Sequence, residues 1–554
     1  MIFIVSIVVF IFFHLFLFFV GRGFLIFFHK ILKKEFNEDA TFLNLQIYYF
    51  YPLISLFVIG NFSLTINFFT GVSNLFVYYA LFFVAFNIFK KFTFHKKYLF
   101  YIYSLIIPFI LASSTYGINF AQDAGHYHLN TQNWIRSDQI HAGLSNLNIR
   151  YGYSSFFDYI SSNFWFDNNF TFLHFTNLIF LVLFFIFLFN NLINHKNSLI
   201  GKASLFIVIF GVLDNFGVGG GRNGYIDIEA VTKSDTPFAI LFFLTFIFIA
   251  DQLVNKKYNL FESTFAFYLL IFAVQMRILG FLLIPLYIYF LYVSRKSKDF
   301  KISKLSLLIN SIIFSLWTLK NIIISGCLIF PVEQTCFSRL SWYSEDSAKL
   351  ENLDLSRFHI SYSLDQNIIV WFQEWITKPI NYSASINFIF SLLVILFISF
   401  LIYGFDNQNL QIKLMLFVFL MLSLFLWIIS LPAIRFGTGI FLSIVSYIGV
   451  LSHDLKIRNL LNKKIFSSFF IFLFFISFAL TIRIDSYSNF LNNFGQIYNL
   501  EPTEVSYIDN RFGWGVVPEL NSSCWINIEC IPEEKSVSFS ENIINIFYLL
   551  DQKK

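Results

Sequence analysis

Runs of about twenty mostly apolar residues recur along the chain, and short segments rich in Lys or Arg separate them. A helix of that length crosses the ~30 Å hydrocarbon core of a bilayer. Because the runs show no alternation of apolar and polar positions, they predict membrane-spanning helices rather than strands of a barrel. The pattern therefore predicts an all-α membrane protein with about 14 transmembrane helices. These helices are expected near residues 2–20, 44–60, 66–89, 98–114, 170–190, 199–213, 237–254, 260–274, 277–293, 305–323, 384–404, 412–430, 437–452 and 465–482.

The composition narrows the class of protein. Hydrophobic residues make up 57% of the 554 positions and charged residues only 13%, and the mean hydropathy is +0.67. Such a chain is too apolar for a soluble domain. Its net charge of +5 fits Lys-rich cytoplasmic loops better than a nucleic-acid partner, so we expect membrane lipids around the protein and no nucleic acid.

The distribution of Lys and Arg predicts the orientation of the helices. If the N-terminus lies outside, every basic linker lies in the cytoplasm, as the positive-inside rule requires. Those linkers are 21–42, 90–97, 191–202, 255–258, 294–304 and 456–464. The loops 115–169, 214–236 and 324–383 and the tail 483–554 then lie outside. We therefore expect a multi-pass protein of the bacterial cytoplasmic (inner) membrane whose polar loops face the periplasm or exterior.

The four cysteines form two local couples in the loops assigned to the outside. The couples are Cys327 with Cys336 and Cys524 with Cys530. An oxidising exterior permits disulfides, so both couples are disulfide candidates, with unpaired thiols as the alternative. Neither couple has the C-x-x-C spacing or the nearby ligand pair of a zinc site.

The first outer loop carries the densest group of titratable residues. Asp123, His126 and His128 lie in the segment DAGHYHL, and the stretches 128–140 and 154–165 mix apolar and polar residues as interfacial helices do. His and carboxylate ligands suit zinc or manganese. Residues at i and i+2 point to different faces of a helix, however, and no second acidic cluster is adjacent. The sequence therefore favours hydrogen bonding by the two histidines over a bound metal, and it identifies no cofactor.

Basic residues also occur where the pattern places the outer membrane boundary. These are Arg277, Lys320 and Arg435. Charges at that depth are costly and usually pair with a carboxylate or a substrate, although a side chain that extends to the interface is the alternative. Asp235 opens an apolar run just after Lys233, with Pro237 behind it. Asp235 is either a helix cap or part of a functional site.

Five short segments resemble, in the expected order, the GT-C type of membrane glycosyltransferase, in particular bacterial members associated with surface-polysaccharide loci. They are DAGHYHL at 123–129, GLSNL at 143–147, KSDTP at 233–237, WTLKN with SGCLIFP up to Pro331, and PAIRFG at 432–437. The resemblance implies a GT-C-like core at 98–482 with interfacial helices in the first large outer loop. Helices at 1–97 would precede the core, and an extracytoplasmic tail would follow at 483–554. Three helices before the core helix depart from the family pattern, which indicates either an N-terminal addition or a different alignment of the core.

The resemblance also implies an activity. Such enzymes transfer a hexosyl or pentosyl group from a polyprenyl-phosphate-linked donor to an acceptor glycan or lipid, usually with inversion, in cell-surface polysaccharide synthesis. The chemistry needs a carboxylate to take the acceptor's proton and cations to hold the departing phosphate. Asp123 is the expected catalytic base. The expected substrate-binding residues are His126, Tyr127, His128, Lys233, Asp235, Arg277, Lys320 and Arg435.

Three other functions compete with this hypothesis. A polysaccharide polymerase or ligase of the O-antigen type would share the lipid-linked donor but extend chains, and it would depend on outer-loop arginines rather than on Asp123. A transporter of lipid-linked sugars would show paired halves or internal repeats, which the sequence lacks. A purely structural membrane protein would not concentrate polar residues on one side.

Overall fold

The computed structural model describes residues 2–32, 37–73, 75–92, 97–114, 123–153, 155–166, 170, 172–216, 232–295, 303–359, 362, 366–405, 408–454, 506–507, 515–516, 530–531, 537–542 and 545–550. Within these residues the chain is an all-α membrane protein, and eight helices are long and apolar enough to cross a membrane. The eight spans lie in α1 (Ile2–Ile31), α2 (Tyr51–Asn67), α8 (Leu173–Asn194), α10 (Asp235–Asn255), α13 (Lys304–Ser325), α16 (Pro379–Ile402), α17 (Leu410–Ser430) and α18 (Ile434–Leu451).

Other elements complete the helical body. The remaining α-helices are α3 (Leu75–Ala85), α4 (Lys97–Tyr101), α5 (Ile107–Ser114), α6 (Leu129–Ser137), α7 (Phe156–Ser161), α9 (Leu199–Phe216), α11 (Leu260–Met276), α12 (Leu283–Ser294), α14 (Glu345–His359) and α15 (Ile368–Thr377). Single-turn helices of 3₁₀ or π type are η1 (Ile47–Phe50), η2 (Phe86–Phe89), η3 (Ile102–Ile106), η4 (Ala124–His128), η5 (Leu144–Asn146), η6 (Ile149–Tyr153), η7 (Ile278–Leu282) and η8 (Glu333–Thr335). The short strands are β1 (Thr41–Phe42), β2 (Leu45–Gln46), β3 (Tyr403–Phe405), β4 (Ser452–Asp454), β5 (Ser506–Tyr507), β6 (Gly515–Val516), β7 (Cys530–Ile531), β8 (Val537–Asn542) and β9 (Asn545–Leu550).

The helices coincide with the apolar runs of the sequence, with two corrected boundaries. Helix α1 continues to Ile31, because Arg22 is buried and paired with Glu38 rather than exposed in a linker. The expected helix at 66–89 begins only at Leu75, because α2 extends to Asn67 and a turn follows. That turn is held against α6, where the backbone N–H of Val72 donates to Ile135 O. The expected helix at 465–482 lies outside the described residues.

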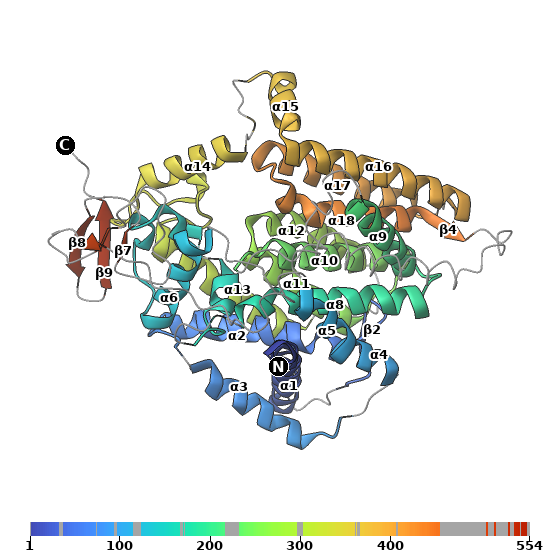
Figure 1. The fold of residues 1–554 in the computed structure, drawn as a ribbon, viewed down its shortest axis with the longest axis horizontal. Coiled ribbons are helices and arrows are strands. Elements are labelled where there is room, and N and C mark those ends of the chain that lie inside the picture. Colours follow the sequence, from blue (N-terminus) through green and yellow to red (C-terminus); the bar gives the residue numbers. More distant parts are fainter. Residues whose placement is uncertain are drawn as a thin grey trace.

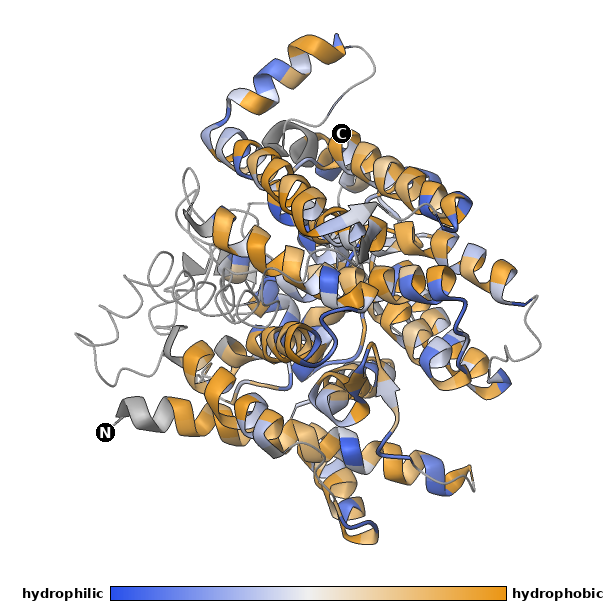
Figure 2. Cartoon of the chain, turned by 90° about the vertical axis from the view of Figure 1, so that its right-hand side faces the viewer, coloured by the Kyte–Doolittle hydropathy of each residue, from blue (hydrophilic) through white to orange (hydrophobic). Residues whose placement is uncertain are grey.

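Helix α10 forms the centre of the packed body, and every apolar side chain along it except Val254 is buried. It packs against α8, α9, α11 and α18 (Figure 1). By contrast, α16 and α17 expose large apolar side chains, among them Phe397 and Val418. Figure 2 shows that the helices are hydrophobic along most of their length. Burying large side chains inside while exposing others outwards fits a body surrounded by lipid.

The N-terminal helices pack directly against the remainder of the body. Helix α1 contacts α5, and α2 contacts α7, α8 and α13. Polar contacts reinforce this packing, since Gln275 donates to Asn61 Oδ1 at 3.1 Å and Tyr159 donates to Asn67 Oδ1 at 3.1 Å. Residues 1–97 therefore pack against the first outer loop and support it, a role that the sequence did not indicate.

The two short helices expected at the membrane interface both form, and one of them is fully buried in the protein. Helices α6 and α7 form in the expected stretches, but all six residues of α7 are buried inside the protein. Gly60 of α2 permits this packing, because a Cβ there would lie 2.6 Å from the Phe156 ring. Helix α7 therefore packs inside the protein, and its position relative to the membrane interface stays a prediction. Helix α15 instead exposes apolar residues such as Ile369 and Phe372.

Contacts join loops that the charge pattern assigns to the same side. At one end, Asn146 donates to Trp342 O, and Tyr153 donates to Glu351 Oε1 at 2.6 Å, so the first and third outer loops meet. At the other end, Arg22 donates to Lys90 O at 2.7 Å, which joins two basic linkers. In Figure 1, α6 and α14 lie at the left of the molecule and β4 at the right.

Candidate active site

Asp123 lies at the start of η4 and is paired with cations from two other segments. Lys233 Nζ lies 3.3 Å from Asp123 Oδ2, and an Arg150 guanidinium nitrogen lies 4.0 Å from Asp123 Oδ1. Lys233 directly precedes α10, and Arg150 belongs to η6. The side chain of Asp123 remains 30% exposed. The first and second outer loops thus meet at one carboxylate that is still open to a ligand.

Electrostatics keep the Asp123 carboxyl ionised at neutral pH. Burial acts to raise its pKa, but the charges of Lys233, His128 and Arg435, together with the Lys233 hydrogen bond, outweigh burial. The pKa of Asp123 is therefore below its ordinary value. A carboxylate of this kind binds cations or hydrogen-bond donors well, but it is a weak proton acceptor.

Tyr127 and His126 occupy the next positions of η4. The Tyr127 ring lies 4.2 Å from the His128 ring and 5.7 Å from the Arg150 guanidinium. Burial and the nearby carboxylates raise the pKa of Tyr127, so its phenol stays protonated. Burial, assisted by Arg150, lowers the pKa of His126 against the opposing effect of Asp123. His126 is therefore neutral at neutral pH.

His128 contacts a buried carboxylate of α7 within hydrogen-bond distance. Its Nδ1 atom lies 3.1 Å from Asp158 Oδ1 and 3.4 Å from Oδ2. Gln132 Nε2 donates to the same Oδ1 at 3.1 Å. The side chain of Asp158 is 3% exposed and that of His128 is 12% exposed. The carboxylate therefore fixes the imidazole, whose side chain keeps a small exposed fraction.

The Lys320 side chain is fully buried near the contact between His128 and Asp158. Its Nζ atom lies 5.7 Å from the Tyr159 ring centroid and 5.8 Å from that of Trp317. The Asp158 carboxylate interacts electrostatically with the Lys320 amine. Lys320 thus faces the interior of the protein and does not extend to the interface.

Asp235 joins two arginines at the start of α10. It is buried, forms an ion pair with Arg277, and has Arg435 Nε 3.6 Å from its Oδ2 atom. Both guanidiniums also lie over the Phe436 ring, at 4.4 Å and 5.2 Å from its centroid. Ser234 occupies the N-cap position, and no side chain caps the helix. The cap interpretation of Asp235 is therefore wrong, because its carboxylate is engaged by the two arginines.

Local backbone features place these arginines. Helix α11 ends at Met276, and Arg277 is extended, with φ −152°, before η7 begins. Arg435 enters α18 just after the extended segment ending at Ala433, whose carbonyl accepts from Trp427 Nε1. Each arginine thus lies at an interruption between two apolar helices, where a charge can leave the membrane interior.

The structure brings every expected catalytic and substrate-binding residue into one region. Asp123, His126, Tyr127, His128 and Lys233 form one part, and the Asp235 ion pairs form a second. The charge of Arg435 reaches Asp123, and that of Arg277 reaches Tyr127, which connects the parts. Sequence reasoning gave no role to Arg150, Gln132 or Asp158. The sequence does mark Asp158 as unusual, because this carboxylate lies among aromatic and apolar residues in FFDYI.

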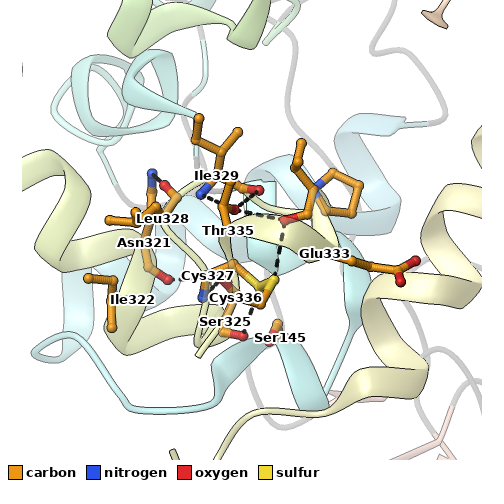
Figure 3. Close-up of a disulfide and its surroundings, with 12 residues drawn as sticks. Ser145, Asn321, Ile322, Ser325, Cys327, Leu328, Ile329, Glu333, Thr335 and Cys336 are labelled. Carbon is orange, nitrogen blue, oxygen red and sulfur yellow. Dashed lines mark hydrogen bonds between the residues drawn. A yellow bond between two sulfur atoms is a disulfide. The ribbon is translucent and has the colours of Figure 1, made fainter. Parts of the chain in front are cut away.

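A disulfide ties down the third outer loop beside this region (Figure 3). Cys327 and Cys336 are bonded, and Ser145 of η5 donates to Ile324 O at 3.0 Å just ahead of the bridge. The disulfide loop therefore holds the loop of Arg150 against the end of α13, which carries Lys320. Cys524 lies outside the described residues, so its pairing with Cys530 stays a prediction. Within the described part, no three His, Cys, Asp or Glu side chains meet as they would around a metal ion.

Comparison with known proteins places the chain in a family. A family model described as a domain of unknown function, DUF8201, matches residues 1–442, and the chain belongs to that family. No curated protein and no solved structure matches the chain. The matched residues include the whole candidate site, from Asp123 to Arg435.

Proposed function

We propose that this member of the DUF8201 family is a membrane glycosyltransferase. It would transfer a sugar from a polyprenyl-phosphate-linked donor to a glycan or lipid acceptor on the outer face of the bacterial cytoplasmic membrane. The observation that carries the proposal is the charge of the candidate site. Four cations meet two carboxylates in the ion pairs there, which leaves a net charge of +2. The cations are Arg150, Lys233, Arg277 and Arg435, and the carboxylates are Asp123 and Asp235.

An excess of positive charge at the end of membrane helices calls for an anionic ligand. Uncompensated charge at this depth is costly, because neither lipid nor packed protein solvates it. A polyprenyl phosphate that leaves a sugar carries a compact negative charge at this boundary, where its prenyl chain can stay in the bilayer. The site thus combines the features that the departing group of such a reaction requires.

Arg277 and Arg435 carry guanidinium groups that could bind that phosphate. The Nε atoms of both are buried and hydrogen-bond to no described residue, although Arg435 Nε lies 3.6 Å from Asp235 Oδ2. A guanidinium presents its donors in a planar fork that fits phosphate oxygens in bidentate geometry. The Arg435 side chain is still 36% exposed. In the proposal these arginines bind the phosphate, and Asp235 keeps them aligned.

The position of the two arginines also suggests where the prenyl chain and the acceptor would bind. The prenyl chain would lie along the exposed apolar surface of α16 and α17, which pack against α18 and thus flank Arg435. Asp123 would orient the acceptor hydroxyl, which approaches from the outer loops. The proposal keeps the expectation of a GT-C-like core with about 14 membrane crossings, and the described residues contain eight helices long and apolar enough to cross a membrane.

Lipid binding tests the proposal. The full-length protein in detergent is titrated with a short polyprenyl phosphate and, as a matched control, with the polyprenol of the same length. The proposal predicts saturable binding of the phosphate that weakens as salt rises, and at least tenfold weaker binding of the alcohol. Equal affinity for both lipids would contradict a phosphate site.

A further inference from the structure

We infer that His128, held in place by Asp158, is the group that accepts the proton of the acceptor hydroxyl. The inference rests on the proposed function and adds a catalytic base to it. Sequence reasoning assigned this role to Asp123. The geometry of the two carboxylates points instead to the imidazole between them.

The contacts of His128 fix one ring nitrogen and leave the other available. Asp158 accepts from Nδ1 at 3.1 Å, which makes Nδ1 the protonated nitrogen and gives Nε2 the free lone pair. Gln132 holds the same carboxylate from the adjacent turn of α6. Among the described residues, none hydrogen-bonds Nε2. A base oriented by a buried carboxylate is the arrangement that activates hydroxyl groups in many hydrolases and transferases.

The surroundings of His128 suit a group that gains a proton during the reaction. Asp158 approaches from α7 and Asp123 from the start of η4, so two carboxylates face the imidazolium that forms. Lys233 faces Asp123, and Lys320 of α13 faces Asp158 on the far side. Each carboxylate is therefore close enough to interact with both His128 and a cation.

Asp123 is less suited to the same step. Its Oδ2 atom is 3.3 Å from Lys233 Nζ, and the acceptor would have to displace this ammonium to use the carboxylate as a base. Its lowered pKa also reduces the driving force for proton transfer. Asp123 can still accept a hydrogen bond from the hydroxyl and so orient it, which makes it a positioning residue.

The step balances in atoms and charge. The acceptor oxygen forms a bond to the anomeric carbon while its proton moves to His128 Nε2. The bond between that carbon and the phosphate oxygen breaks, and its electron pair leaves with the polyprenyl phosphate. Arg277 and Arg435 lie where that added charge would be stabilised. The imidazolium then releases its proton to water.

The test compares pH profiles of kcat/KM for transfer from synthetic polyprenyl-phosphate hexoses by the full-length protein in liposomes. For the wild type we expect activity to fall on the acidic side of the profile, because a base that is already protonated cannot accept the hydroxyl proton. His128→Gln should lose about 10²–10⁴-fold in rate and lose that acidic limb. Asp158→Asn should move the limb to lower pH, because the imidazolium loses a stabilising carboxylate. A purely structural role for Asp158 would leave the limb where it is.

A second histidine–carboxylate pair in the same loop provides a matched control. His141 Nε2 lies 2.8 Å from Asp138 Oδ2, three residues earlier in the chain. His141→Gln should keep the wild-type rate within about twofold and the wild-type profile, since it lacks any part in proton transfer. Binding of the short polyprenyl phosphate to each variant checks that the protein is folded.

Three results would overturn the inference. One is a His128→Gln protein that binds the lipid and transfers sugar at near wild-type rate with its acidic limb intact. Another, independent of variant folding, uses wild-type protein acylated with diethyl pyrocarbonate, in which peptide mass spectrometry finds His128 fully modified while transfer continues. The third is a wild-type protein that consumes no donor, which would refute both the proposed function and this inference. The first two results would refute only the inference and would leave the proposed function intact.

Discussion

Lys233 Nζ lies 3.3 Å from Asp123 Oδ2, although α8 and α9 separate the two residues along the chain. The ion pair joins the first outer loop to the start of α10, where Asp235 binds two arginines. The contact therefore connects the part of the site that we assign to the acceptor with the part that we assign to the donor phosphate.

Replacing Asp123 should separate its role in catalysis from its role in folding. Asp123→Asn keeps the shape of the side chain but removes the charge that holds Lys233. We expect normal insertion and unchanged lipid binding, with transfer reduced about 10²-fold because the acceptor is no longer oriented. Transfer is measured by mass spectrometry of donor and product.

Asp235→Asn, assayed in parallel, should behave differently. It leaves Arg277 and Arg435 without their carboxylate, so we expect a lower unfolding temperature and altered lipid binding. If Asp123→Asn transferred sugar at near wild-type rate while Asp235→Asn did not, the orienting carboxylate would be Asp235, and the role of Asp123 would be refuted.

The pH dependence of stability offers a test that does not require a substrate. The pKa of Asp123 is lower in the folded protein than its ordinary value of 3.8. Its ion pairs therefore stabilise the protein fully above about pH 4, and this contribution is lost as the pH falls through the lowered pKa. The difference in unfolding temperature between wild type and Asp123→Asn should stay constant from pH 8 to pH 5 and shrink only below pH 4. A difference that already shrinks between pH 7 and pH 5 would contradict the strong pairing with Lys233.

Arg435 provides a test of the phosphate site. Arg435→Ala should weaken binding of a short polyprenyl phosphate at least tenfold, because a charge-assisted and potentially bidentate contact is lost. Arg435→Lys should restore binding only in part, since an ammonium lacks the planar fork. Arg295→Ala is the control, because Arg295 lies beyond α12 and stacks on Tyr292. Unchanged affinity in the Arg435→Ala protein would exclude Arg435 from the phosphate site.

The orientation of the protein can be tested with exposed single cysteines. Ser137 and Ser341 are exposed in the first and third outer loops, whereas Lys257 is exposed in a basic linker. In intact cells, an impermeant thiol reagent should label Ser137→Cys and Ser341→Cys, and it should label Lys257→Cys only after lysis. The opposite pattern would place the candidate site in the cytoplasm and exclude a donor that is used on the outer face.

The sequence predicts the helices better than their arrangement. Apolar length alone places the long apolar helices such as α8, α10 and α17, because a membrane span needs a continuous run of apolar residues. It does not reveal that α7 is buried, since that depends on Gly60 of α2 leaving space for the Phe156 ring. Nor does it show that Arg22 lies inside α1, because the pairing partner, Glu38, comes from a later loop.

Some members of the candidate site were predictable from the sequence, but Arg150, Gln132, Asp158 and the pairing of the charges were not. Charged residues are rare in this chain, so their positions beside apolar runs mark Asp123, Arg277 and Arg435. Which carboxylate meets which cation depends on contacts between distant segments, such as that of Asp158 with His128. Local sequence therefore suggested Asp123 as the base, and only the three-dimensional arrangement points to His128.

The most direct test of the central claim is donor consumption in membranes. Membranes of the source cell, first without the protein and then with wild-type protein restored, are incubated with a panel of isotope-labelled polyprenyl-phosphate hexoses and pentoses. Mass spectrometry follows the release of polyprenyl phosphate and the transfer of label to glycan or lipid. The account predicts that at least one donor releases polyprenyl phosphate and passes its sugar to an acceptor only when the wild-type protein is present, and that Asp123→Asn abolishes most of this transfer. If restoring the protein changed neither release nor labelling for any donor in the panel, the account would be contradicted.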